Sequence, residues 1–247
     1  MDINNKTALV TGGASGLGKV IVEDLLKYGA KVAIFDINQT ALDLMKENDN
    51  LFLIQCDLTK EEDIQNSVDM TLKKFSKIDI LVNNAGILYS EPLINIMSTK
   101  KRHSPSTWKK VIDINLTAPF ILTSYVVEQM VMNRTKGVII NISSISAKGN
   151  AGQSAYSAAK AGLESMSKVW SKELGSFGIR SVSIAPGFMD TESTHNAVTE
   201  KMLDHMKKQT PIKKLGNAEH ISSTVCFIIQ NDHISGKTLE IDGGLVI

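Results

Sequence analysis

Short apolar runs alternate with longer amphipathic segments along the whole chain. Seven runs rich in Val, Ile and Leu predict strands, at residues 7–12, 30–36, 51–57, 78–86, 137–144, 179–187 and 238–244. None of them alternates cleanly between apolar and polar positions, which is typical of strands covered on both faces. Segments of helical periodicity lie between them, at residues 17–27, 39–47, 61–75, 108–132, 154–177, 200–208 and 218–229. This order predicts the α/β class, a doubly wound parallel sheet with helices on both faces.

The domain organisation follows from what the pattern lacks. We find no internal repeat, low-complexity tract or linker, so we expect residues 1–247 to form a single domain. Two stretches break the alternation. Residues 94–107 are polar and basic with a proline, and predict a surface excursion. Residues 187–216 exceed a simple strand-to-helix connection, and form either a lid over a substrate or a pair of surface helices.

Composition narrows the classes of partner. The 27 basic and 26 acidic side chains leave a net charge of +1, so no global field attracts nucleic acid or anionic lipid. No apolar run approaches a membrane span and the start has no signal-peptide pattern, so we expect a cytoplasmic protein without a membrane partner. Cys56 and Cys226 each lie in an apolar run, as buried thiols in a reducing compartment do.

A glycine-rich turn follows the first predicted strand. The sequence TGGASGLG, residues 11–18, runs straight into a helix. Backbone N–H groups and the positive end of a helix bind a pyrophosphate where no side chain blocks the approach. The positions that matter are Gly12, Gly16 and Gly18, and Ser15 and Leu17 between them complete the candidate contacts. The spacing differs from GxGxxG, but its place at the start of a βαβ unit favours a dinucleotide.

The second predicted strand ends at an acid, Asp36. A carboxylate at this place accepts both ribose hydroxyls of an adenosine and repels a 2′-phosphate. Ile37 and Asn38 supply no cation, and the one nearby charge, Lys19, could point to solvent from the start of its helix. The sequence therefore predicts NAD as the cofactor, in preference to NADP.

The stretch SAYSAAK, residues 154–160, places Tyr156 and Lys160 on one face of a helix. At this spacing the ammonium can act on the phenol. Alanine-rich helices also carry exposed Tyr and Lys side chains by coincidence, so the pair alone leaves both interpretations open.

The motifs taken together resemble the short-chain dehydrogenase/reductase family, in its single-domain branch. They are TGGASGLG, NNAG at residues 83–86, Ser144, YSAAK at residues 156–160, and PG at residues 186–187. The resemblance covers essentially the whole chain, and five strings in this order do not arise by chance. It implies a Rossmann-like fold and an oxidoreductase with a nicotinamide cofactor.

The resemblance also implies catalytic roles. Tyr156 is expected to donate a proton to a carbonyl during reduction, or to act as the base when an alcohol is oxidised. A free phenol titrates near pH 10, so a phenolate near neutrality needs about 4 kcal/mol of stabilisation, which Lys160 and the nicotinamide charge would supply. Lys160 would also bind the nicotinamide ribose. Ser144 would hold the substrate oxygen, and Ser143 is the alternative, although the count from the strand end favours Ser144.

Other positions match the family with alternatives left open. Asn115 matches an asparagine that anchors a water in a proton relay from the lysine, although a helical Asn is commonly a surface residue. Asp57, followed by Leu58, matches an acid beside the adenine, and it also suits an N-cap. Thr191 matches a contact to the nicotinamide carboxamide, or caps a helix. The remaining implied cofactor contacts are Asn83, Ala85, Gly86, Tyr156, Pro186 and Gly187.

Metal chemistry has no support in the sequence. The histidines are scattered and share no ligand spacing, so we expect no metal site; they are His103, His195, His205, His220 and His233.

The substrate is the least determined property. The strings NAGQSAY and SGKTLEIDGG resemble the 3-oxoacyl-thioester reductases, but most of those prefer NADPH, and residues 94–107 exceed their usual length. We expect an NAD-dependent enzyme that interconverts a small-molecule secondary alcohol and a ketone. A 3-oxoacyl or 3-hydroxyacyl thioester is a candidate for that substrate. An alcohol, polyol or sugar dehydrogenase is the alternative, and a catalytically silent NAD-binding scaffold or sensor a remote one. The family resemblance implies a homo-oligomer, expected to be a tetramer.

Overall fold

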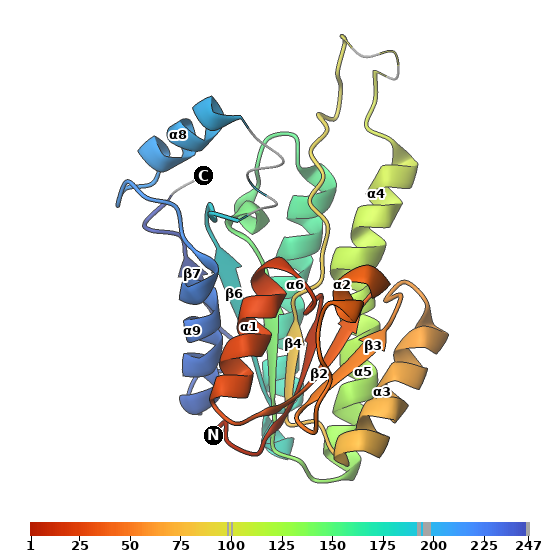
Figure 1. The fold of residues 1–247 in the computed structure, drawn as a ribbon. Coiled ribbons are helices and arrows are strands. Elements are labelled where there is room, and N and C mark those ends of the chain that lie inside the picture. Colours follow the sequence, from red (N-terminus) through yellow and green to blue (C-terminus); the bar gives the residue numbers. More distant parts are fainter. Residues whose placement is uncertain (98, 100, 192–193, 195–198, 246–247) are drawn as a thin grey trace.

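One parallel sheet organises the part of the chain that the computed structural model describes, residues 1–97, 99, 101–191, 194 and 199–245. Its seven strands lie in the order β3-β2-β1-β4-β5-β6-β7 (Figure 1). They are β1 (Thr7–Thr11), β2 (Lys31–Asp36), β3 (Leu51–Gln55), β4 (Ile80–Asn83), β5 (Val138–Ile142), β6 (Arg180–Pro186) and β7 (Thr238–Ile241). Every pair of neighbours is parallel, which confirms the predicted fold class.

Helices cover both faces of the sheet (Figure 1). On one face α1 (Gly16–Lys27) packs beside α9 (Ala218–Gln230). The other face carries α3 (Glu61–Phe75), α5 (Ala118–Met132) and α6 (Ser154–Glu173). Successive side chains of β1 enter different cores, since Val10 packs under α1 and α9 whereas Leu9 packs under α3 and α5. Both faces are therefore buried, as the unbroken apolar runs predicted.

Among the described residues, the other α-helices are α2 (Gln39–Asp43), α4 (Pro105–Ile112) and α8 (Glu200–Gln209). The helix expected at residues 39–47 is shorter than predicted, because the chain after it already turns toward β3. Glu47 Oε1 there accepts a 2.8 Å hydrogen bond from the backbone N–H of Leu53. The helix expected at residues 154–177 also ends early, and a 3₁₀ turn at Gly175–Phe177 follows it.

The helix expected at residues 108–132 begins earlier, at Pro105, and contains a π-helical turn. This turn, Asp113–Thr117, joins α4 and α5 into one run of 28 residues with a mean hydropathy of 1.3 in its most apolar window. By length and composition that run could cross a membrane, so our expectation that no segment approaches a span is wrong on this measure. The run nevertheless packs on the sheet, because Leu122 and Val126 of α5 are buried in the core between this helix and the strands.

The described residues of the predicted surface excursion that precede α4 belong to an arm that projects beyond the strand ends (Figure 1), whereas residues 98 and 100 lie outside the described residues. Within it Asn95 N–H donates to the Lys101 carbonyl at 2.7 Å. At its base Glu91 N–H donates to the Gly152 carbonyl at 2.7 Å. The arm is therefore attached to the loop that leads into α6.

Candidate active site

The candidate residues gather where the parallel strands end. The strand order changes direction between β1 and β4, because β1 leads outward to β2 and β3 while β4 begins the other half of the sheet. In doubly wound sheets ligands bind in the crevice beyond the carboxyl ends of the strands at this point. The predicted glycines follow β1, Asp36 ends β2, the NNAG motif starts at the last residue of β4, and Ser144 follows β5.

The glycine turn has the geometry that a pyrophosphate needs. Gly12 and Gly16 have φ angles of +63° and +52°, which side-chain-bearing residues rarely adopt. A Cβ on Gly18 would lie 2.1 Å from the Gly12 carbonyl oxygen, so the start of α1 can approach the turn only with glycine there. A Cβ on Gly16 would meet nothing within 4 Å. The turn is thus closed toward the protein at Gly18 and open at Gly16.

Two more predicted residues border this turn. Ser15 is exposed and precedes α1 in an extended conformation, with no hydrogen bond from its side chain to the helix end. Leu17 is partly buried and packs against the core beneath α1 and α9.

Asp36 is fixed beside the glycine turn by both carboxylate oxygens. Oδ2 accepts a hydrogen bond from Ala14 N–H at 3.1 Å and Oδ1 accepts one from Asn38 N–H at 3.0 Å. The side chain of Lys19 is exposed. Since each carboxylate oxygen has a second lone pair, Asp36 keeps the capacity to accept from two hydroxyls.

The NNAG motif is attached to the glycine turn by residues that sequence reasoning missed. Thr11 Oγ1 accepts hydrogen bonds of 3.0 Å from the N–H groups of Asn84 and Ala85. Asn84 Nδ2 donates to the carbonyls of Thr11 at 2.9 Å and Gly12 at 3.2 Å. The doubled asparagine and the threonine that ends β1 were the available signals for this link.

The side chain of Asn83 forms its hydrogen bonds inside the fold and not with the turn. It is buried, and its Nδ2 donates to Thr123 Oγ1 at 3.0 Å and to Asn141 Oδ1 at 2.8 Å. Its side chain therefore joins β4 to β5 and α5.

Asp57 follows β3 but does not cap α3, whose N-cap is Lys60. Its Oδ1 instead accepts from the N–H of Thr59 at 3.0 Å and from the Thr59 hydroxyl at 2.7 Å. The side-chain hydrogen bond from Thr59 is the main cause that lowers the pKa of Asp57. Leu58 packs against the core beside α3.

The segment after β6 contains three further candidates. Pro186 ends the strand, and a Cβ on Gly187 would lie 2.6 Å from the Asp242 Cα, so this crossing requires glycine. Thr191 Oγ1 accepts a hydrogen bond from Thr194 N–H at 3.3 Å, as in the capping alternative. Much of residues 187–216 is described, but 192–193 and 195–198 lie outside the described residues.

Asn115 is fully buried within the π-helical turn. Its Nδ2 donates to the carbonyls of Ile87 at 3.0 Å and Val111 at 2.9 Å, and its Oδ1 accepts from Ile87 N–H at 3.2 Å. A Cβ on Gly86 would lie 2.5 Å from that Oδ1. The side chain is thus not a surface group but fixes the backbone just after the NNAG motif, and π-turns commonly occur at functional sites.

Tyr156 and Lys160 lie on one face of α6, as predicted. Lys160 is buried, its Nζ donates to the Ile142 carbonyl at 2.7 Å, and it lies 5.6 Å from the centroid of the Tyr156 ring. Burial lowers the pKa of Lys160 to about 8, so the amine is largely protonated at neutral pH.

The phenol has the opposite perturbation. Burial raises the pKa of Tyr156, and a side-chain hydrogen bond with Ser144 opposes this change. A phenolate near neutrality is therefore not a property of the chain alone, and the nicotinamide charge that we expect to act together with Lys160 is not part of the chain. The chain holds Tyr156 as a neutral phenol, the form that donates a proton.

The two adjacent serines contact different parts of α6. Ser144 lies against Tyr156, and its Oγ also accepts from Ser146 N–H at 3.1 Å. The Ser143 hydroxyl donates to Glu164 Oε1 at 2.8 Å and lies 3.3 Å from the Lys160 carbonyl oxygen. The geometry thus favours Ser144 as the serine that can share a substrate oxygen with Tyr156.

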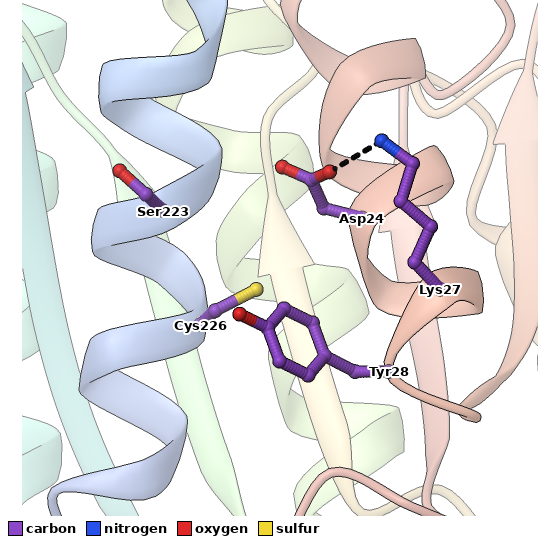
Figure 2. A pocket seen from close by; sticks show the side chains of 5 residues that line it. All are labelled: Asp24, Lys27, Tyr28, Ser223 and Cys226. Carbon is purple, nitrogen blue, oxygen red and sulfur yellow. Dashed lines mark hydrogen bonds and ion pairs between the residues drawn. The ribbon is translucent and has the colours of Figure 1, made fainter.

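One hollow and two thiols are not part of the predicted set of site residues. A hollow of about 330 Å³ lies between α1 and α9, and none of the candidate residues lines it. Figure 2 shows the side chains that line it, among them Asp24 and Lys27, which pair at 2.9 Å. Burial raises the pKa of the Cys56 and Cys226 thiols to about 11, so both favour the unreactive thiol form.

Among the described residues no group of three His, Cys, Asp or Glu could hold a metal ion, and His195 lies outside them.

Comparison with known proteins identifies the family. The family model described as short chain dehydrogenase matches residues 6–202. The chain belongs to the short-chain dehydrogenase family. It is therefore an oxidoreductase that interconverts CH–OH groups and the corresponding carbonyls with a nicotinamide cofactor, as the motifs predicted.

Relatives within the short-chain dehydrogenase family align over nearly the entire chain. A sorbitol-6-phosphate 2-dehydrogenase of Klebsiella pneumoniae is 34% identical over 99% of this chain and 97% of its own length. A 3-oxoacyl-[acyl-carrier-protein] reductase of Thermotoga maritima is 35% identical over 100% of both chains. A reductase of the same name from Chlamydia muridarum is 36% identical over 98% of this chain and 97% of its own.

Proposed function

We propose that this protein is an NAD-dependent oxidoreductase that reduces a 3-oxoacyl thioester to the 3-hydroxyacyl thioester, or catalyses the reverse reaction. The observation that carries the proposal is the contact between Ser144 and Tyr156 above the buried ammonium of Lys160. Both hydroxyls can donate to the same substrate oxygen, and the lysine ammonium lies close to them. This arrangement suits a carbonyl oxygen that gains negative charge during reduction.

The residues at the strand ends fit a dinucleotide. The open side of the glycine turn at Gly16 and the first N–H groups of α1 would hold the pyrophosphate. Asp36 would accept the adenosine ribose hydroxyls, and Lys160 would bind the nicotinamide ribose. We assign adenine contacts to Asp57 and Leu58, and further contacts to Ala85, Gly86, Pro186, Gly187 and Thr191. When bound, the nicotinamide supplies or accepts the hydride.

The preference for NAD rests on charge. The carboxylate of Asp36 is held at the turn by Ala14 N–H, and a 2′-phosphate would be placed against it. Neither Ile37 nor Asn38 offers a cation to offset that repulsion, and the Lys19 side chain is exposed to solvent.

The chain's own residues divide the proton chemistry. The Tyr156 phenol donates its proton to the carbonyl oxygen in reduction, while the Ser144 hydroxyl orients that oxygen by a hydrogen bond. Lys160 stabilises the phenolate that remains, since its ammonium is fixed by Ile142 and is desolvated. Asn115 fixes the Ile87 backbone, and we assign it the anchoring of the proton relay from Lys160 to solvent.

The substrate assignment has a second candidate. The relatives named 3-oxoacyl-[acyl-carrier-protein] reductase support the thioester, together with the NAGQSAY string. The relative named sorbitol-6-phosphate 2-dehydrogenase is about as similar and favours a polyol. In both cases we place the substrate beneath residues 187–216.

The decisive experiment measures initial rates of NADH and NADPH consumption with an acetoacetyl thioester. We expect turnover with NADH that is lost in Tyr156→Phe. If the thioester is inert while NAD is reduced with sorbitol 6-phosphate or another polyol, the second candidate replaces the first. Tight NADH binding without turnover of any alcohol or ketone would contradict catalysis and favour a silent NAD-binding protein.

We also propose that the chain is one domain, acts in the cytoplasm and assembles into a homo-oligomer, a tetramer by family resemblance. The outer side of α5 supports assembly, because Phe120 is 52% exposed and Met132 is 75% exposed on a helix that is apolar all round. Light scattering should show a smaller particle for Phe120→Glu than for the wild type. Identical masses would contradict assembly through this face.

A further inference from the structure

We propose that Ser143 and Glu164 form a positioning pair that fixes α6 on the end of β5 and so places Tyr156 against Ser144. The inference rests on the proposed function, and it adds two residues that do not contact the reacting atoms. It stands on hydrogen bonds, burial and the spacing of residues along α6.

Ser143 is held at a fixed place between two strands and the helix. It is 3% exposed, and its N–H donates to the Ile184 carbonyl of β6 at 2.7 Å. Its hydroxyl donates to Glu164 Oε1 at 2.8 Å and approaches the Lys160 carbonyl at 3.3 Å. The side chain thus connects the end of β5 with two successive turns of α6.

Two consecutive residues at the end of β5, Ile142 and Ser143, contact Lys160 at its ammonium and at its backbone carbonyl. Ile142 accepts from the Lys160 ammonium at 2.7 Å, and the Ser143 hydroxyl reaches the Lys160 backbone carbonyl. Because the ammonium and the backbone of this residue contact neighbouring positions of one strand, α6 cannot slide or roll along β5 without breaking these bonds.

The four-residue spacing along α6 links the fixed position of the helix to the position of the Tyr156 phenol. Tyr156, Lys160 and Glu164 succeed one another at intervals of four, so they lie in one row on α6. The strand end meets the same row in order, since Ser144 contacts Tyr156 while Ser143 contacts Glu164. A rotation of α6 that released Glu164 would therefore change the separation of Ser144 and Tyr156. A misplacement of about 1 Å can cost about 10²-fold in rate.

The hydrogen bond, and not the negative charge, is the feature that positions the helix. The carboxylate of Glu164 is only partly buried, and its electrostatic influence extends to Lys148. A glutamine at this position keeps an oxygen that accepts from Ser143 and removes the charge. The two contributions are thus separable by substitution.

The test compares Ser143→Ala, Glu164→Ala, Glu164→Gln and the double variant Ser143→Ala/Glu164→Ala. The matched control is Ser167→Ala, because the Ser167 hydroxyl also joins α6 to the sheet, 2.9 Å from Ser181 Oγ, but far from Tyr156. The readouts are kcat and KM for the ketone, the NADH dissociation constant, the melting temperature, and the phenol titration of Tyr156 by ultraviolet absorbance without cofactor, assigned with Tyr156→Phe.

We expect Ser143→Ala and Glu164→Ala each to lower kcat about 10-fold with little change in NADH affinity. The double variant should be no worse than either single variant, since one interaction is lost in all three. Glu164→Gln should retain most of the wild-type kcat. The measured titration of Tyr156 should move to higher pH in the two alanine variants, because its contact with Ser144 loosens, and it should stay unchanged in Ser167→Ala.

Equal losses of kcat in Ser143→Ala and Ser167→Ala would overturn the inference, since they would indicate general loosening of α6. A loss in Glu164→Gln as large as in Glu164→Ala would also overturn it in favour of charge. If the wild type turns over no ketone, the proposed function fails, and the Tyr156 titration still decides whether the pair positions the phenol.

Discussion

The ammonium of Lys160 lies 5.6 Å from the centre of the Tyr156 ring and donates to the Ile142 carbonyl at 2.7 Å. Lys160 is buried and Tyr156 is partly buried, and burial acts on the two titratable groups in opposite directions. It lowers the pKa of the lysine to about 8 and raises that of the phenol. The pair therefore favours a neutral phenol, although the family chemistry needs a phenolate in one direction. The positive charge of an oxidised nicotinamide is the physical source that fits this requirement.

The burial of Lys160 predicts that stability rises with pH above neutrality. The folded state releases the lysine proton near pH 8, whereas the unfolded chain holds it until about pH 10.5, so the unfolded state binds more protons in between. We expect the wild-type free energy of unfolding to rise by about 1.5 kcal/mol between pH 8 and about pH 9.5, relative to Lys160→Met. Urea denaturation of the cofactor-free protein measures this. The exposed Lys168→Met on the same helix is the control, and it should show the wild-type dependence.

Substitution of Asp36 tests the choice of cofactor. Asp36→Asn keeps one oxygen acceptor and removes the charge that would repel a 2′-phosphate. The ratio of kcat/KM for NADH to that for NADPH should fall about 10-fold or more, because hydrogen bonds to charged groups contribute about 1.5–3 kcal/mol. The matched variant Lys19→Ala should leave the ratio close to that of the wild type. An unchanged ratio in Asp36→Asn would place the selectivity elsewhere.

The close approach at Gly18 predicts a combined loss of stability and cofactor binding. A Cβ in Gly18→Ala would lie 2.1 Å from the Gly12 carbonyl oxygen, so the backbone of the turn must shift. Such overpacking costs about 1–3 kcal/mol of stability. We expect a lower melting temperature and at least about 10-fold weaker NADH binding by fluorescence titration. Gly175→Ala, whose Cβ meets nothing within 4 Å, provides the comparison and should change neither quantity appreciably.

The buried amide of Asn115 predicts a loss of both stability and turnover. Asn115→Ala leaves the N–H and carbonyl of Ile87 and the carbonyl of Val111 without their side-chain partner. The bond to the Val111 carbonyl is buried and the two bonds to Ile87 are partly buried. One unsatisfied buried group costs about 1–3 kcal/mol, so denaturant midpoints should fall clearly. Turnover should decrease because the backbone after the NNAG motif is released. Asn133→Ala, at the exposed end of α5, should behave as the wild type, and a similar loss there would contradict the argument.

Prediction from the sequence succeeded where the signal is local. The helix expected at residues 61–75 forms with those bounds, since three acidic residues occupy its first turn and two lysines its last, which suits the helix dipole. The helix at residues 39–47 was overextended because the interaction of Glu47 with Leu53 belongs to the next strand. The π-helical turn around Asn115 was also missed, since its hydrogen bonds run to Ile87 across a separation of 28 residues.

The sequence by itself determined the order of elements, the parallel sheet and the family motifs, because periodicity and turn chemistry are properties of neighbouring residues. The tertiary structure decided which polar side chains meet. Thr11 and Asn84 are 73 residues apart, yet one hydroxyl connects the glycine turn with the NNAG motif. The tertiary structure also directed Asn83 into the core, set Ser143 against Glu164 and Ser144 against Tyr156, and partly buried the phenol. These outcomes depend on contacts between distant segments and on burial, neither of which a local pattern contains.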